Sequence, residues 1–275
     1  MLLQRVRRPQ AAAAAAAAAW LFLGAAMRML PAVAAASTTP EVSGVPIETR
    51  DGWRISGLYH PPRRRLPVVL LIHGAESGKG EWGAFSPMLW KKGFGTMAID
   101  LRGHGESKAG PRGREDFRSA LDRRRAWTSA TEDLRAAIRE IRRLAPASPV
   151  GMIGASIGAN LAAAVYQEDR RIAWMALLSP GVEYRGVRLA RPSRGPVAVA
   201  ASPDDAYAFA SARALAAQSP HVEFIKGSGG HGVQMFADAR FESRMLAWIV
   251  GASKISARSA KSGREPGPST ATTRR

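Results

Sequence analysis

Short runs of apolar residues alternate along the chain with longer amphipathic or alanine-rich segments. An apolar run of this length, bounded by turn residues, predicts a buried β-strand, whereas apolar residues that recur every three or four positions predict a helix. We predict strands at residues 42–49, 53–59, 68–72, 96–99, 150–153, 172–178, 197–201 and 221–225. We predict helices at residues 86–92, 129–145, 157–166 and 237–250. The second helix is expected to begin with a Ser-x-x-Glu capping box formed by Ser129 and Glu132.

The order of these elements predicts an α/β fold. Asp51-Gly52, between the first two strands, is a hairpin turn signal, so the sheet is expected to begin antiparallel. After it the strands alternate with helices, and this alternation is typical of a mostly parallel sheet covered on both faces. We therefore predict one domain over residues 37–251 with an eight-stranded, mostly parallel sheet.

The amino-terminal segment has the features of an export signal. No acidic residue occurs before Glu41, and three arginines precede an apolar stretch at residues 11–27 and small residues at 34–36. We expect residues 1–36 to be a signal peptide and the protein to be periplasmic or secreted. An uncleaved membrane anchor, a transit peptide and an alanine run without a targeting role are the alternatives. The chain has no cysteine, so disulfides and a lipoprotein anchor are excluded.

The formal net charge of +18 raises the question of an anionic partner. Half of this charge lies near the two ends, because residues 1–36 hold four basic and no acidic residues, and residues 252–275 hold six basic and one acidic. The remaining arginine runs, such as residues 123–125, have few aromatic residues among them, which favours a solvated surface over a nucleic-acid groove. We expect residues 252–275 to be a disordered basic tail with weak contact to anionic surfaces. We expect no specific nucleic-acid partner, and the oligomeric state stays open.

One motif carries the strongest chemical signal. Gly154-Ala155-Ser156-Ile157-Gly158 is a G-x-S-x-G sequence between a predicted strand and an alanine-rich helix. A turn sharp enough to expose a serine hydroxyl at a sheet edge crowds its neighbours, and glycines two positions away on either side relieve the crowding. The helix amino terminus also favours developing negative charge. Ser156 is therefore the candidate nucleophile.

With this motif the chain resembles the α/β-hydrolase superfamily, and within it the capless serine esterases and dienelactone hydrolases. The resemblance extends over about residues 42–250. His73-Gly74 resembles the oxyanion loop of that superfamily, and Asp100-x-Arg102-Gly103-His104-Gly105-x-Ser107 resembles the loop after its fourth strand. The superfamily order of nucleophile, acid and histidine implies Ser156, Asp204 and His231.

The chemistry explains why these residue types occur together. A serine hydroxyl attacks poorly until an imidazole can take its proton, and His231 is expected to be that base. A carboxylate on the far ring nitrogen fixes the tautomer and stabilises the imidazolium. We expect Asp204 in this role, with Asp205 as the fallback acid.

The oxyanion hole is expected to consist of the backbone N–H groups of Ala75 and Ile157. His73 is expected to be a structural hydrogen-bonding residue and His104 a turn residue. The sequence departs from the lipase His-Gly-Gly-Gly pattern by reading His-Gly-Ala-Glu at residues 73–76, which leaves the subfamily open.

Some features bound the surroundings of this site. About eighteen residues separate the strand ending at 178 from the one beginning at 197, too few for a helical cap, so an open site is expected. Trp82, Phe85 and Met88 either form an apolar wall beside the oxyanion loop or belong to the core. No histidine and carboxylate spacing suggests a metal site, and we expect neither metal nor cofactor.

The sequence thus predicts a serine hydrolase that cleaves a carboxylic ester or related small acyl compound. Thioester, amide and transfer chemistry stay open. A non-catalytic binding protein of the same fold at the cell envelope is one alternative. The other is a nucleotide-binding oxidoreductase, since residues 78–83 match G-x-G-x-x-G; five residues separate the preceding strand from the first of these glycines, which a tight phosphate-binding turn does not tolerate easily.

Overall fold

The computed structural model describes residues 41–118 and 126–262. The predicted signal peptide, the arginine run at 123–125 and the last thirteen residues of the chain lie outside this part. The strands are β1 Ser43–Glu48, β2 Arg54–His60, β3 Val68–Ile72, β4 Gly95–Ile99, β5 Ala109–Gly110, β6 Gly113–Arg114, β7 Val150–Ala155, β8 Ile172–Leu178, β9 Glu183–Tyr184, β10 Val187–Arg188, β11 Val197–Ala201 and β12 Val222–Lys226. The α-helices are α1 Ser86–Lys91, α3 Ala126–Ser129, α4 Thr131–Leu144, α5 Ile157–Glu168, α6 Ala206–Gln218 and α7 Ala239–Ser262, with 3₁₀ helices η1 Lys79–Trp82 and η2 Gly232–Ala237.

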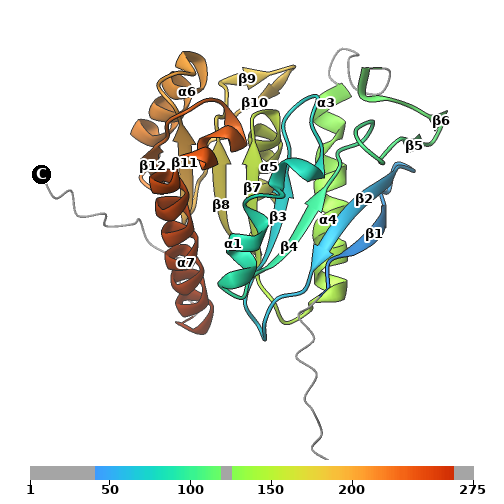
Figure 1. Cartoon of the computed structure of the whole chain (residues 1–275), viewed down its shortest axis with the longest axis horizontal. Coiled ribbons are helices and arrows are strands. Elements are labelled where there is room, and N and C mark those ends of the chain that lie inside the picture. The colour runs from blue at the N-terminus through green and yellow to red at the C-terminus, as the bar shows by residue number, and fades with distance from the viewer. Residues whose placement is uncertain (1–40, 119–125, 263–275) are drawn as a thin grey trace, which may run out of the picture. The chain divides into compact units, whose positions relative to one another are not determined.

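A mixed sheet organises the domain (Figure 1). Within the described residues it has ten strands in the order β12-β11-β8-β7-β3-β4-β2-β5-β6, with β1 paired to β2. The pairs from β12 to β4 are parallel, and β2 pairs antiparallel with both β1 and β4. Eight of the strands are the predicted ones, and β5 and β6 add two residues each. The α/β fold with an antiparallel start is confirmed.

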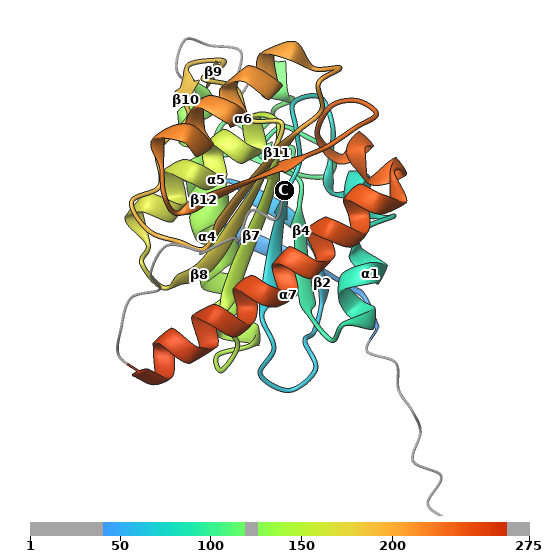
Figure 2. The same cartoon turned by 90° about the vertical axis from the view of Figure 1, so that its left-hand side faces the viewer.

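Helices cover both faces of the sheet, which is why its central strands are apolar throughout (Figure 2). Along β3, Val68, Leu70 and Ile72 belong to the core cluster that includes residues of α4, α5 and α6. Val69 and Leu71 belong to the cluster on the other face, which includes residues of α1 and α7. Successive side chains of β3 point to opposite faces of the sheet, so the strand contributes to the hydrophobic core on each face, and all five of its residues are buried.

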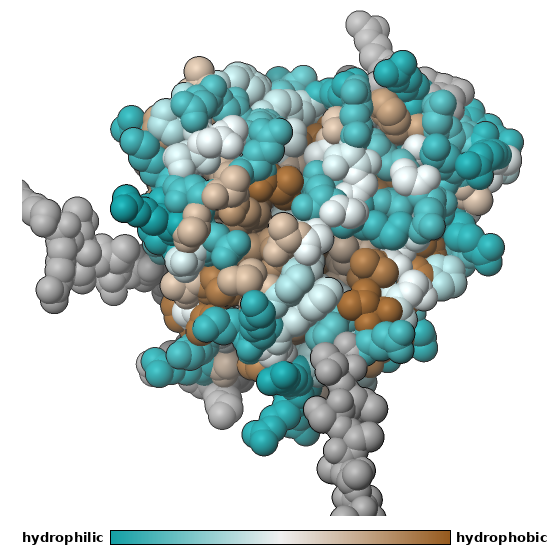
Figure 3. All heavy atoms as spheres, viewed as in Figure 1, coloured by the Kyte–Doolittle hydropathy of each residue, from teal (hydrophilic) through white to brown (hydrophobic). Residues whose placement is uncertain are grey.

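Polar residues cover most of the face shown in Figure 3, and hydrophobic residues appear there in small separate areas. Among the described residues, the exposed large hydrophobic ones are Leu58, Leu66, Val182, Tyr207 and Ile255. No helix within residues 41–118 and 126–262 is long and apolar enough to cross a membrane.

The predicted capping box is wrong. Helix α4 begins at Thr131 with Ala130 as its N-cap. The hydroxyl of Ser129 donates instead to the carbonyl oxygen of Ala126 at 2.6 Å, because Ser129 ends the short helix α3. A residue that closes one helical turn cannot also cap the next helix.

The predicted carboxy-terminal boundary is also wrong. Helix α7 continues to Ser262, so the first part of the segment expected to be a disordered tail is helical. Ala252 and Ser253 are buried, and the hydroxyl of Ser256 donates to the carbonyl oxygen of Ala173 on β8 at 2.8 Å. Packing against the sheet therefore extends the helix beyond its strongly apolar part.

Helix α6 and the β9–β10 hairpin were not predicted. Helix α6 consists largely of alanine and other small residues, so its sequence shows little amphipathic contrast. The hairpin strands have two residues each, which is too short for a period-two pattern to be recognised.

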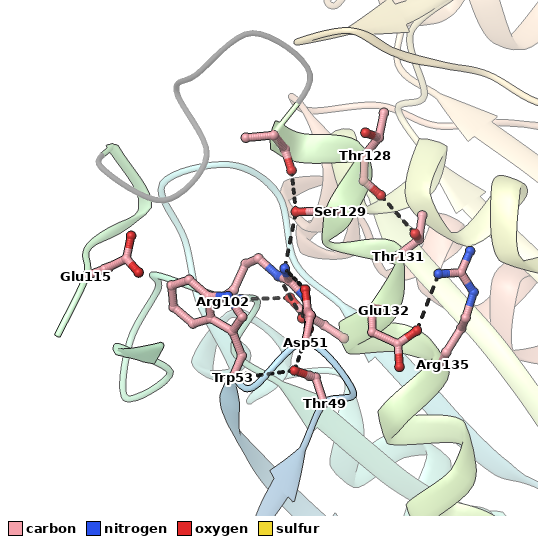
Figure 4. A network of polar contacts seen from close by, with 12 residues as sticks. Thr49, Asp51, Trp53, Arg102, Glu115, Thr128, Ser129, Thr131, Glu132 and Arg135 are labelled. Atoms are coloured by element: carbon pink, nitrogen blue, oxygen red, sulfur yellow. Dashed lines mark hydrogen bonds and ion pairs between the residues drawn. The ribbon is translucent and has the colours of Figure 1, made fainter. Parts of the chain in front are cut away.

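A buried cation connects the antiparallel start of the sheet to helix α4 (Figure 4). The guanidinium of Arg102 is 3% exposed and donates to Asp133 Oδ1, which is 0% exposed, at 2.7 Å. It also donates to Asp51 Oδ2 at 2.6 Å and to the hydroxyl of Ser129 at 3.2 Å. The ring of Trp53 lies 5.5 Å from the guanidinium carbon. One arginine therefore holds together the β1–β2 turn, the loop after β4 and the start of α4.

We predict that Asp133→Ala lowers the free energy of unfolding by about 3–5 kcal/mol, because it leaves the Arg102 cation buried without its main partner. Urea denaturation followed by circular dichroism measures this change. Glu140→Ala, which removes a more exposed carboxylate of the same helix, is the control and is expected to stay close to the unaltered protein. Equal stability of the two variants would contradict the role given to Arg102.

Candidate active site

Ser156 occupies the sharp turn between β7 and α5. Its backbone has φ 56° and ψ −126°, a conformation that side-chain-bearing residues rarely adopt. Its N–H donates to the carbonyl oxygen of Leu178 at 2.8 Å, and its own carbonyl oxygen accepts from Ala159 N–H at 2.9 Å. These hydrogen bonds to β8 and α5 hold the turn, and the side chain stays partly exposed while its neighbours are buried.

The two glycines of the motif are required by close backbone contacts. A Cβ atom on Gly154 would lie 2.4 Å from the carbonyl oxygen of Gly158. A Cβ atom on Gly158 would lie 2.5 Å from the carbonyl oxygen of His73 and 2.7 Å from that of Ile72. Backbone atoms of neighbouring elements cannot move aside as a flexible side chain can. The motif therefore lets α5 begin directly against the end of β3.

A cavity of about 470 Å³ opens at this edge of the sheet, where the carboxyl ends of the parallel strands meet. Its lining includes Ser156 and His231, the loop residues Gly74 and Ala75, and the acidic side chain of Glu81. The structure thus brings the predicted nucleophile, base and oxyanion loop together around one space.

The structure pairs His231 with Asp205. The imidazole Nδ1 lies 2.5 Å from Asp205 Oδ2, while Asp205 Oδ1 accepts from Ala208 N–H at the start of α6. Because the ionised carboxylate only accepts, Nδ1 carries the proton and Nε2 keeps its lone pair. Nε2 is therefore the ring nitrogen that would take a proton from a hydroxyl in the cavity.

The preference for Asp204 is wrong in this structure. Asp204 is exposed, and its Oδ2 accepts from the hydroxyl of Ser202 at 2.9 Å and from Gly229 N–H at 3.2 Å. It therefore positions the glycine loop before His231 and does not contact the imidazole. The fallback acid, Asp205, holds that position because the N-cap residue of α6 projects toward the loop.

Further contacts position the histidine loop. Gly232 N–H donates to the hydroxyl of Ser179 at 2.8 Å, and His231 N–H donates to Gln234 Oε1 at 2.9 Å. Ser179 is fully buried at the end of β8 and has φ 48°. Sequence reasoning missed Ser179, since a serine after a buried strand gives no signal of its partner fifty residues away.

No hydrogen bond joins Ser156 Oγ and His231 within the part of the chain that the structure describes. Both side chains line the same cavity. The hydrogen bond between nucleophile and base is often long before substrate binds and shortens in the complex.

The oxyanion loop follows β3 and is anchored by His73. Its Nε2 accepts from Leu101 N–H at 2.9 Å, so Nδ1 carries the proton and donates to the carbonyl oxygen of Gly74 at 2.6 Å. Burial lowers the pKa of His73 to about 4, so the ring is neutral and can make both bonds. The predicted structural role of His73 is confirmed, and His104, whose Nδ1 lies 3.1 Å from the carbonyl oxygen of Arg102, belongs to the neighbouring turn as predicted.

The predicted oxyanion donors lie on this loop and at the start of α5. Among the described residues, no protein group accepts a hydrogen bond from the backbone N–H of Ala75 or of Ile157. Both residues flank the cavity region, since Ala75 lines it and Ile157 directly follows Ser156. These two N–H groups are available to an oxygen placed beside Ser156.

Glu81 is a site residue that sequence reasoning missed. Its Oε1 accepts from Gly74 N–H at 3.3 Å, and burial raises the pKa of its carboxyl group. Glu81 belongs to η1, within the G-x-G-x-x-G sequence at residues 78–83 on which the nucleotide-binding alternative rests. In the structure this G-x-G-x-x-G segment is a four-residue 3₁₀ helix, which does not offer the long helix of a dinucleotide site.

The segment between β8 and β11 contains the short hairpin β9–β10 and no helix. It therefore carries no helical cap, as the length of this segment predicts. The Tyr184 ring lies 6.4 Å from the His231 ring. Arg185, at the hairpin turn, reaches Glu76 on the oxyanion loop at 3.5 Å. Trp82 and Phe85 are buried in the core cluster, so these two rings form core and not a cavity wall.

Comparisons with known proteins identify the family of the chain. The family model described as serine aminopeptidase S33 matches residues 63–205, which include Ser156 and both aspartates and end before His231. No curated protein matches the sequence.

Solved structures of hydrolases share the fold at low identity. An esterase from Pyrococcus furiosus is 18% identical, with a TM-score of 0.61, and the match covers 78% of this chain and 92% of that one. A dienelactone hydrolase from Anabaena variabilis is 15% identical, with a TM-score of 0.59 and coverage of 78% and 96%. An esterase from Exiguobacterium antarcticum is 12% identical, with a TM-score of 0.57 and coverage of 77% and 100%.

We predict that Gly158→Ala lowers the free energy of unfolding by about 2 kcal/mol or more, because its Cβ would overlap backbone oxygens at the end of β3. The matched control is Gly251→Ala in α7, where a Cβ meets nothing within 4 Å. That change is expected to raise the free energy of unfolding by about 0.5–1 kcal/mol, because alanine is more favourable than glycine in a helix interior. Thermal or urea denaturation compares the two, and a Gly158→Ala variant as stable as the control would contradict the close contact.

Proposed function

The chain belongs to the α/β-hydrolase superfamily, in the family described as serine aminopeptidase S33, and from this premise we propose that it hydrolyses a carboxylic ester or related acyl compound through an acyl-enzyme on Ser156. The observation that carries the proposal is that Ser156, in its strained turn, and His231, paired with a carboxylate, line one cavity. Strained backbone at a nucleophile turn is the feature expected where a side chain must project from a sheet edge.

The first half of the reaction forms the acyl-enzyme. Ser156 Oγ attacks the substrate carbonyl carbon while His231 Nε2 takes the hydroxyl proton. Asp205 stabilises the resulting imidazolium through its contact with Nδ1. When the tetrahedral intermediate collapses, the bond to the leaving oxygen breaks and Nε2 returns the proton to it.

The second half releases the acid. Water attacks the acyl carbon while His231 Nε2 takes its proton, and the bond to Ser156 Oγ breaks as the proton passes to that oxygen. In both halves the carbonyl oxygen becomes negative. The N–H groups of Ala75 and Ile157 would donate to it, and the amino end of helix α5 favours the same charge.

The choice of an ester rests on the similar structures, which include esterases and a dienelactone hydrolase. The family description names an aminopeptidase. Both reactions share the acyl-enzyme, and an amide differs in that its amine must be protonated to leave. A cavity of about 470 Å³ suits a small acyl compound.

We predict that a fluorophosphonate probe labels the protein at Ser156 and that Ser156→Ala abolishes labelling without unfolding the protein. The reason is that the probe reacts only with an activated serine oxygen. Mass spectrometry of the labelled peptide identifies the residue, and circular dichroism checks the fold. An unlabelled, folded protein would indicate a binding scaffold in place of a hydrolase, and nicotinamide binding would indicate the oxidoreductase alternative.

We predict that Asp205→Asn lowers kcat for a para-nitrophenyl ester by about a thousandfold or more, because the amide no longer stabilises the imidazolium or fixes the tautomer. The neighbouring Asp204→Asn is the matched control, with an expected loss of less than about tenfold, since Asp204 contacts Ser202 and the glycine loop and not the imidazole. Steady-state kinetics on both variants decide the assignment, and the opposite ranking would return the acid role to Asp204.

A further inference from the structure

Glu81 places a carboxylate at the wall of the cavity, on the side that it shares with His231. Of the described residues that line this cavity, Glu81 is the one acidic side chain. Its hydrogen-bond donors are neutral, namely Gly74 N–H and the hydroxyl of Ser77. Within the described residues, no lysine or arginine forms an ion pair with it.

Two acidic groups near Glu81 are paired with cations. Glu76, on the same loop, reaches Arg185 at 3.5 Å. Asp100 accepts from Lys79 Nζ at 2.6 Å. Asp205, beside the cavity, faces the imidazole of His231. Glu81 is therefore the acidic residue of the described cavity lining, and the nearby group of opposite sign is the His231 imidazole, which is charged only when protonated.

The surrounding structure holds Glu81 in place. Its neighbour in η1, Trp82, is fully buried. Two residues before Glu81, Lys79 donates through both its backbone N–H, at 2.7 Å, and its side chain to the buried carboxylate of Asp100. Anchors on both sides of Glu81 keep its carboxylate at the cavity wall, so its charge acts from a defined position.

A charge that is partly removed from water acts more strongly than an exposed one, because less solvent screens it. A substrate cation entering the cavity gains this interaction, whereas a substrate carboxylate meets repulsion. We propose that Glu81 makes the site selective for esters that carry a positively charged group, such as a quaternary ammonium, over neutral and anionic ones. The proposal rests on the ester hydrolysis proposed above.

The test compares substrates that match in shape and differ in charge. One series consists of para-nitrophenyl esters whose acyl chain ends in a trimethylammonium, a tert-butyl or a carboxylate group. A second series consists of acetate esters of choline and of its neutral tert-butyl analogue, which places the charge on the alcohol side. The measured quantity is the ratio of kcat/KM for the charged and the neutral substrate, in which any general change in catalysis cancels.

We expect a cation-to-neutral ratio of about ten in at least one series, and a lower kcat/KM for the carboxylate ester than for the neutral one. Glu81→Gln, which keeps an oxygen acceptor for Gly74 N–H but removes the charge, is expected to bring the ratios to about one. Glu48→Gln removes one exposed carboxylate at the end of strand β1 and is the charge-matched control, with unchanged ratios. Ratios of about one in both series, or ratios that Glu81→Gln leaves unchanged, would overturn the proposal.

A second measurement uses the unaltered protein alone, so it does not require any variant to fold. In the unaltered protein, raising sodium chloride from about 20 mM to about 500 mM is expected to lower the cation-to-neutral ratio by screening. A ratio that stays at ten across this range would overturn an electrostatic origin. If neither the neutral esters nor the fluorophosphonate probe reacts, the ester hydrolysis itself fails, and the selectivity fails with it; hydrolysis without charge preference rejects the selectivity alone.

Discussion

The site depends on the close packing of three backbone segments: the end of β3, the end of β7 and the first turn of α5. Gly158 has no room for a side chain because the carbonyl oxygens of Ile72 and His73 lie where its Cβ would be. Gly154 lies against Gly158 in the same way. This contact brings the oxyanion loop, which leaves β3, next to Ser156, which begins α5. Without it Ser156 and the loop would lie on separate elements whose positions are not fixed relative to each other.

Buried polar residues hold the loops around this contact. His73 bridges the oxyanion loop to the loop after β4 through its two ring nitrogens. Asp100 ties that loop to η1, and Arg102 ties it to the β1–β2 turn and to α4. Each group is buried and each has partners, which is the condition under which buried charges are tolerated. The Asp-x-Arg-Gly-His-Gly segment at residues 100–105 therefore connects the loops around the site. Its own side chains do not line the cavity.

The charge of the cavity follows from the same arrangement. Glu76 and Asp100 have cationic partners, and the carboxylate of Asp205 contacts the His231 imidazole. Glu81 lines the cavity and has neutral hydrogen-bond donors, and within the described residues no lysine or arginine pairs with it. An overall charge of +18 gave no indication of this local sign, since most of the arginines lie on exposed surfaces or near the chain ends. Selectivity depends on the field inside the cavity and not on the charge of the whole molecule.

The sequence by itself determined the eight main strands, the order of the elements and the position of Ser156. Continuous apolar runs, turn residues and a glycine two positions away on either side of a serine are local features, and local sterics make them informative. It did not determine which of two adjacent aspartates faces His231, that α7 continues past residue 252, or that Ser129 would close a helix and not cap one. The tertiary structure decided these, together with the places of Ser179 and Glu81. Neighbouring side chains point in different directions, and only the packing of segments far apart in the chain decides which direction leads to a partner.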